Sequence, residues 1–289
     1  MPTSISISNE HLTIDVSSLG AEMQALSSRD GRSWLWNGDA TFWNGRSPIL
    51  FPIVGKAADD TISIDGQSYP MGQHGFARRS EFALAEHTAT KTRHELAASP
   101  ATKAVYPFDF LLAVEHMIEG RSLTVAAEVS NRDLRPMPFG VGFHSAFVWP
   151  LPGAGEKAHD VVLDNGGEPA LVRLKGGLIN PEPLASPFAH GRLVLDHAMF
   201  DADAMIFPEG AGKGLRYGVD GGPALKFDFE NLPNLALWTK PGAPFLCVEP
   251  WHGTAATVGS SGELADRPST TMLAPGETAR FAFTVEIPA

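Results

Sequence analysis

Three short segments place an ionisable side chain among glycine, proline and aromatic residues. They are segments 73–78 (QHGFAR), 142–147 (GFHSAF) and 248–253 (VEPWHG). Apolar neighbours limit the hydration of His74, His144 and Glu249, and poor hydration shifts pKa values in the way that acid–base chemistry uses. Glu249 is the strongest candidate, because a carboxylate rarely ends a buried apolar strand without a partner. For either histidine alone, a hydrogen-bonded core position is the more common interpretation.

Alternating apolar and polar residues predict the strands that must position these groups. Period two is clear in segments 12–16, 123–129 and 281–287, and it is typical of half-buried strands. The dipeptide at 65–66, Asp-Gly, lies between two such runs and favours a tight antiparallel hairpin. The sequence therefore predicts a mainly β protein in the form of a large sandwich.

Helix and domain boundaries are harder to find. Windows 22–27 and 202–207 admit a turn or two of helix, and longer helical windows are scarce because 29 Gly and 23 Pro are spread through the chain. The Gly- and Pro-rich clusters at 150–155, 176–183 and 220–223 are short and lie among strand-like runs, which is typical of hairpin loops. We therefore expect a single domain over residues 1–289.

Composition excludes several classes of protein. Of the 289 residues, 43% are hydrophobic and 19% are charged, which predicts a folded globular chain. The formal net charge of −11 disfavours nucleic acid and anionic membrane surfaces as partners. The single cysteine, Cys247, has no internal disulfide partner and is expected to be a small buried hydrophobe. No secretory signal and no apolar run of about 18 residues is present, so a cytoplasmic protein is expected.

The ordered motifs resemble the aldose 1-epimerase superfamily. The resemblance begins with segments 47–56 (SPILFPIVGK) and 74–78 (HGFAR), continues through 142–144 and 248–251, and reaches 273–277. It is most similar to the branch encoded beside lactose genes, and segment 74–78 is also similar to the hexose-phosphate mutarotases. The resemblance implies a large antiparallel β-sandwich of the galactose mutarotase type with the sugar in an open cleft on one sheet. It also implies aldose 1-epimerase (mutarotase) activity without a metal or organic cofactor.

The resemblance also implies roles for particular residues. His144 matches the family's general acid, Glu249 its general base, and His74 a second histidine that holds the sugar near its ring oxygen. Asp203 matches the aspartate that binds sugar hydroxyls. Lys56 stands where many relatives carry an arginine, so it retains the charge but not the planar fork, and it is expected to contact the substrate.

Neighbouring residues suggest contacts to the sugar. Arg78 belongs to the shared motif and, with Arg79, offers a site for hydroxyls or a phosphate. Trp149, Trp238 and Trp251 are candidates for stacking on a sugar face, with a core position as the alternative for each. Seven other histidines show no paired spacing and are expected at the surface or in turns: His11, His87, His94, His116, His159, His190 and His197.

Mutarotation explains why an acid and a base are needed together. The ring opens when a base removes the proton of the anomeric hydroxyl while an acid delivers a proton to the ring oxygen, and reversal closes the other anomer. Three alternatives stay open: an iron or manganese site of two histidines and one carboxylate, a glycosidase using Asp203 and Glu249, and a sugar-binding protein without turnover. A small sugar is the expected partner of a monomer or homodimer, with free hexose preferred over hexose 6-phosphate because of the net negative charge.

Overall fold

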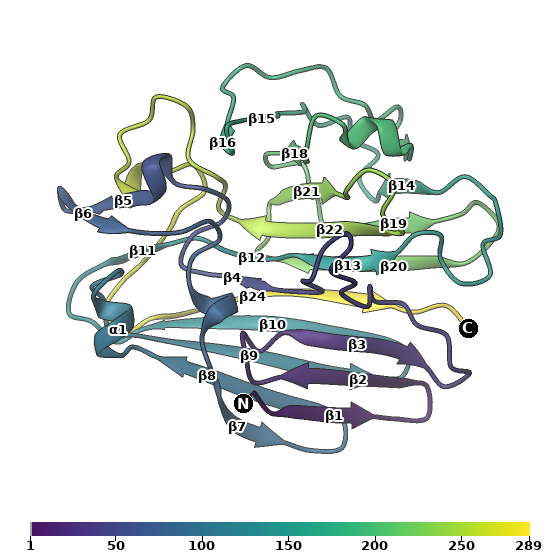
Figure 1. Cartoon of the computed structure of the whole chain (residues 1–289), viewed down its shortest axis with the longest axis horizontal. Coiled ribbons are helices and arrows are strands. Elements are labelled where there is room, and N and C mark those ends of the chain that lie inside the picture. Colours follow the sequence, from purple (N-terminus) through teal and green to yellow (C-terminus); the bar gives the residue numbers. More distant parts are fainter. Residues whose placement is uncertain (1) are drawn as a thin grey trace.

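The computed structural model describes residues 2–289, and its named strands pair antiparallel throughout (Figure 1). The larger of two main sheets has nine strands in this described part of the chain. In order across the sheet they are β17 (Arg192–Val194), β14 (Asp160–Leu163), β19 (Gly214–Gly218), β20 (Ala224–Glu230), β24 (Thr278–Glu286), β10 (Ser122–Asn131), β9 (Phe110–Glu119), β8 (Lys91–Ala97) and β7 (Ala83–His87). The mainly β class predicted from the alternating pattern is confirmed.

The second main sheet has six strands within residues 2–289. They are β18 (Met205–Phe207), β21 (Asn234–Trp238), β22 (Phe245–His252), β12 (Val141–Phe143) and β4 (Ile49–Leu50), with β13 (Ser145–Val148) paired to β22. Smaller sheets join β1 (Ser4–Ser8), β2 (Leu12–Ser17) and β3 (Met23–Ser28); β5 (Thr61–Ile64) and β6 (Gln67–Pro70); β11 (Met137–Phe139) and β23 (Thr271–Leu273); and β15 (Leu174–Lys175) and β16 (Leu178–Ile179).

Helical structure is confined to single turns in the described residues. They are α1 (Pro100–Lys103) and the 3-10 turns η1 (Ala58–Asp60), η2 (Ala77–Arg79), η3 (His197–Phe200) and η4 (Leu264–Asp266). No helix within residues 2–289 is long and apolar enough to cross a membrane. The window 22–27 lies almost wholly in β3 and 202–207 leads into β18, so the expectation of helix there was wrong.

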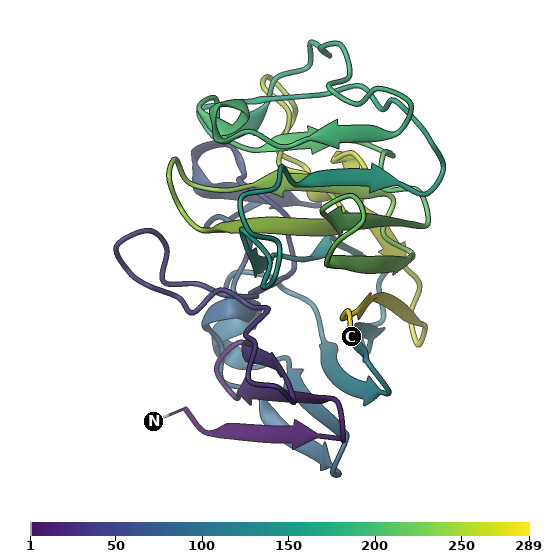
Figure 2. The same ribbon diagram turned by 90° about the vertical axis from the view of Figure 1, so that its right-hand side faces the viewer.

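The two main sheets pack face to face through aromatic side chains. Phe143 of β12 meets Phe283 of β24 with ring centroids 5.1 Å apart, and Phe147 of β13 meets Phe227 of β20 at the same distance. Figures 1 and 2 place the purple β1–β3 sheet beside β7 and β8, at the opposite end from the green loops that follow β14. One cluster of buried hydrophobic residues includes side chains from Ile7 to Ile287.

Strand β22 separates the core from the opposite face of its sheet. Leu246 and Val248 belong to the main core cluster, whereas Phe245 and Cys247 belong to a separate apolar cluster on the other face. Successive side chains on a strand point to opposite faces, so Glu249 shares the face of Phe245 and Cys247. The core therefore fixes the direction in which Glu249 points.

Three histidines expected at the surface are buried. His94, His116 and His159 are 0%, 1% and 2% exposed, so their assignment to surface or turns was wrong. His94 has charged neighbours in sequence, Arg93 and Glu95, but on a strand those side chains point to the opposite face. The charged neighbours therefore describe the outer face of β8, while His94 lies on its inner face.

Candidate active site

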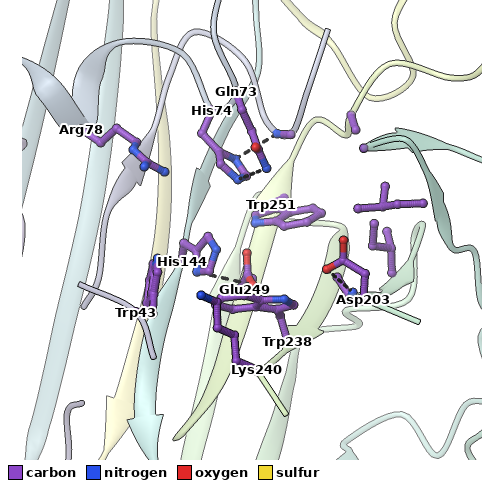
Figure 3. A pocket seen from close by; sticks show the side chains of 16 residues that line it. Trp43, Gln73, His74, Arg78, His144, Asp203, Trp238, Lys240, Glu249 and Trp251 are labelled. Atoms are coloured by element: carbon purple, nitrogen blue, oxygen red, sulfur yellow. Dashed lines mark hydrogen bonds and ion pairs between the residues drawn. The ribbon is translucent and has the colours of Figure 1, made fainter. Parts of the chain in front are cut away.

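A cavity of about 330 Å³ lies over the outer face of the six-stranded sheet (Figure 3). Its volume is within the range of small-molecule sites. Six of the seven residues predicted from the sequence line it: His74, Arg78, His144, Asp203, Glu249 and Trp251. They come from segments up to 177 positions apart in sequence (74 to 251), and the sheet brings them together.

His144 and Glu249 form a buried acid–base pair at the centre of the cavity. Glu249 is 2% exposed and His144 is 8% exposed, and the His144 Nδ1 and Glu249 Oε1 atoms are 3.4 Å apart. The contact does not have hydrogen-bond geometry, so within residues 2–289 the buried Nδ1 atom has no hydrogen-bond partner. Buried polar groups normally have partners, and these two are positioned to find theirs in a ligand.

The protein environment moves the pKa values of this pair in opposite directions. Burial, and then the charge of Asp203, raises the pKa of Glu249 well above its usual value of 4.5. Burial, and then the charge of Arg78, lowers the pKa of His144 from 6.5 to about 3. Both shifts favour the uncharged form of each group in the empty cavity, and in that form the pair holds one transferable proton.

His74 is held as a neutral hydrogen-bond donor. The Gly55 backbone N–H donates to His74 Nδ1 at 3.1 Å, and burial lowers the pKa of His74 well below 6.5. The neutral ring therefore carries its proton on Nε2. The Gln73 Nε2 atom, 3.3 Å away, is also a donor, so this contact does not use the His74 N–H. The rings of His74 and His144 are 5.6 Å apart, so one small molecule can reach both.

Close packing requires a glycine near each of these histidines in the sequence. His74 and Gly75 both have positive φ, at 64° and 70°, and a Cβ on Gly75 would lie 2.1 Å from the Phe51 carbonyl oxygen. A Cβ on Gly142 would lie 2.4 Å from Cδ1 of Trp251. The glycines in the HGF and GFH motifs are therefore required by close packing behind and beside the cavity.

Aromatic rings cover the acid–base pair. Trp43 stacks on His144 with centroids 4.8 Å apart at 27°, and Trp238 meets His144 edge-on at 5.6 Å. Trp251 lies on the same face of β22 as Glu249, as the labelled side chains in Figure 3 show. These rings exclude water from the pair and offer flat apolar surfaces for a sugar ring.

Charged groups occupy the rim of the cavity. Asp203 has φ 67°, and its Oδ1 accepts from the Ala204 N–H at 2.8 Å, so the short turn after η3 fixes its carboxylate toward the cavity (Figure 3). Arg78 is half-buried, and within residues 2–289 its guanidinium has no hydrogen-bond or ion-pair partner. Lys240, at the end of the segment that follows β21, also lines the cavity.

Some predicted contacts lie outside the cavity. Lys56 is not among the lining residues, and its side chain packs beside Gly177 while its carbonyl accepts from the Ala256 N–H at 2.9 Å. Trp149 stacks on His197 with centroids 4.1 Å apart instead of facing the cavity. Arg79 donates to the Gly75 carbonyl at 3.3 Å, which is a local structural contact.

Sequence reasoning did not single out Trp43 or Lys240, although both line the cavity. Trp43 lies in the irregular segment between β3 and β4, where no periodic pattern indicates a direction for its side chain. Trp43 is held by its own carbonyl, which accepts from Trp36 Nε1 at 2.8 Å. Lys240 lies two positions beyond the end of β21, so strand alternation gave no direction for its side chain.

The chain belongs to the aldose 1-epimerase family, whose model matches residues 3–267. It is 30% identical to the chromosomal LacX protein of Lactococcus lactis subsp. lactis over 98% of this chain and 99% of that protein. Two solved structures are similar over 99% of the chain. A galactose mutarotase related enzyme from Lactobacillus acidophilus has a TM-score of 0.93 and 26% identity, with 98% of it covered. A galactose mutarotase-like protein from Lactobacillus casei has a TM-score of 0.92 and 28% identity, with all of it covered.

Proposed function

We propose that this protein is an aldose 1-epimerase that interconverts the α and β anomers of a hexose. Membership of the family and the galactose mutarotase-like fold support epimerase activity in general terms. The observation that carries the specific proposal is the buried His144–Glu249 pair, which has a proton to move and no protein partner for His144 Nδ1. Its partner in catalysis is the hemiacetal of the sugar.

Ring opening uses the single proton of this pair. In the reactive form the Glu249 carboxylate takes the proton of the anomeric hydroxyl, and the His144 imidazolium gives a proton to the ring oxygen. The C1–O5 bond breaks as the C1=O bond forms. Opening leaves both groups uncharged, which is the state that their shifted pKa values favour. Rotation about C1–C2 and the reverse transfers then close the other anomer.

Other cavity residues orient the sugar during this exchange. The Nε2–H of His74 is fixed as a donor and is close enough to His144 to share the ring oxygen as acceptor. Asp203 accepts from sugar hydroxyls, and Trp251 and Trp238 lie against the apolar face of the ring. The roles of His74 and Asp203 are those that the family resemblance implies.

The test is exchange NMR of the anomeric protons of glucose and galactose with purified protein. Glu249→Gln removes the base at constant size, and a loss of about a hundredfold or more in exchange rate is expected. Glu230→Gln is the matched control on an exposed carboxylate and leaves the rate unchanged. Sugar binding, followed by the fluorescence of the cavity tryptophans, is retained in Glu249→Gln. Binding without exchange in the wild type would select a non-catalytic sugar-binding protein instead.

The pH dependence offers a second test of the one-proton pair. The rate is expected to be constant from just above pH 3 up to the raised pKa of Glu249, and to fall above it because the pair then holds no proton. A rate that already falls as the pH drops through about 4.5, as for an ordinary glutamate base, contradicts this assignment.

A hexose phosphate is the second candidate substrate. Arg78 and Lys240 both reach the cavity, and the Arg78 guanidinium lacks a partner among the described residues, which is the arrangement that a phosphate group would complete. The net charge of −11 opposes an anionic substrate at longer range. The same NMR assay with glucose and glucose 6-phosphate, using wild type and Arg78→Gln, distinguishes the two candidate substrates. If Arg78 binds a phosphate, Arg78→Gln lowers the exchange rate of glucose 6-phosphate and not that of glucose.

A further inference from the structure

The chain's single cysteine lies directly beneath the acid–base pair. Cys247 is two residues before Glu249 on β22, on the same face, and is fully buried. One ligand atom each from His144, Cys247 and Glu249 lies within 4.8 Å of the others. Nitrogen, sulfur and oxygen donors are thus gathered at one point, and two of the three residues, His144 and Glu249, line the cavity.

The three groups have little else to bind in the protein. His144 Nδ1 is buried without a hydrogen-bond partner in residues 2–289, although it is 3.4 Å from Glu249 Oε1. Within the same residues the Glu249 carboxylate accepts no hydrogen bond from a backbone amide or hydroxyl, and its single polar contact is His144. A sugar hydroxyl can satisfy His144 and Glu249, but proton transfer to a sugar has no use for the thiol.

We propose that His144, Cys247 and Glu249 bind a thiophilic divalent cation, with Zn²⁺ and Cd²⁺ as the class, in competition with the sugar. Zinc bonds of about 2.0–2.3 Å to N, O and S place neighbouring ligands about 3.3–3.8 Å apart in a tetrahedron. The His144–Glu249 separation is already in this range, and the thiol of Cys247 needs a shift of about 1 Å at most to join them. The fourth position faces the cavity.

Binding of the cation releases protons, and the nitrogen and sulfur ligands make the site selective for thiophilic cations. The cation displaces the thiol proton of Cys247 and the single proton held by His144 and Glu249, so affinity rises with pH. Hard cations such as Mg²⁺ and Ca²⁺ require oxygen ligands and do not compete. Inhibition of anomer exchange rests on the proposed function, whereas binding of the cation does not.

The experiment titrates Cd²⁺ into the full-length, metal-stripped protein and follows the ultraviolet thiolate-to-cadmium charge-transfer band. One equivalent is expected to produce the band, and Cys247→Ala to abolish it and to weaken Zn²⁺ binding in equilibrium dialysis by about tenfold or more. Cys247→Ser, which keeps the size of the side chain, guards against misfolding and is expected to lose the band as well. Mg²⁺ at equal concentration is the control for non-specific binding.

Activity is measured separately on the same samples. Zn²⁺ is expected to inhibit anomer exchange by the wild type, with reversal by a chelator, and to inhibit Cys247→Ala at least tenfold less strongly. A wild type without the band, or with equal Zn²⁺ affinity in Cys247→Ala, would overturn the proposed site. If the band forms but the wild type exchanges no anomers, the metal site stands and the epimerase proposal falls.

Discussion

Replacing Arg267 by methionine is expected to destabilise the protein by about 3 kcal/mol, at about 1 kcal/mol for each of three buried acceptors. Arg267 is 6% exposed. Its Nη2 donates to the carbonyl oxygens of Val54, Lys56 and Thr254 at 3.0, 3.2 and 2.9 Å. Methionine fills a similar volume without a donor, so these oxygens lose a buried charged partner. Burial of the guanidinium is itself unfavourable and lowers its pKa to about 10. The methionine variant avoids this cost, which limits the loss of stability.

The assay is urea denaturation followed by tryptophan fluorescence, where the midpoint is expected to fall at constant slope. The matched control is Arg280→Met, which removes an exposed ion pair with Glu230 and is expected to cost about 0.5 kcal/mol or less. If Arg267→Met costs no more than Arg280→Met, the carbonyl contacts do not stabilise the fold. The same variant is expected to slow anomer exchange, because segment 54–56 supplies the Gly55 N–H that holds His74.

Three further predictions follow from burial and close packing. Lowering the pH from 7 to 5 should reduce the contribution of His116 to the free energy of unfolding by about 2 kcal/mol, because its pKa is about 3 when folded and 6.5 when unfolded. A urea titration of His116→Leu should show a weaker pH dependence. Gly75→Ala should destabilise by more than about 2 kcal/mol, since its Cβ would lie 2.1 Å from the Phe51 carbonyl oxygen. Gly142→Ala should displace Trp251 and weaken sugar binding, measured by tryptophan fluorescence; unchanged affinity contradicts this.

Much of the fold was predictable from local sequence because hairpins are local structures. Alternation in segments 123–129 and 281–287 gave two strands, β10 and β24, that do pair, and Asp65-Gly66 lies in the turn between β5 and β6. The wrong assignment of His94 to the surface has a physical cause. The charged neighbours of His94 were taken to mean that the whole segment is exposed. On a strand, however, the side chains of those neighbours point to the face opposite to that of His94.

The candidate site was predictable to the extent that it lies in motifs. Segments 73–78, 142–147 and 248–253 each contribute a lining residue. Trp43 and Lys240 reach the cavity from segments whose paths depend on tertiary contacts, and a single sequence does not give those contacts. Lys56 shows the opposite case, because it follows a lining glycine, Gly55, and packs beside another, Gly177, yet does not line the cavity itself.

Strand β22 connects the hydrophobic core to the proposed catalytic pair, His144 and Glu249, without an intervening loop. Val248 is packed in the core and Glu249 is its immediate neighbour on the other face. A methyl group added or removed at Val248 therefore changes the height of the strand above the core, and with it the distance from the carboxylate to His144. Substitutions in the hydrophobic core of this protein are therefore expected to change its reaction rate as well as its stability. Evolution of the core and evolution of the proposed activity are thus coupled through β22.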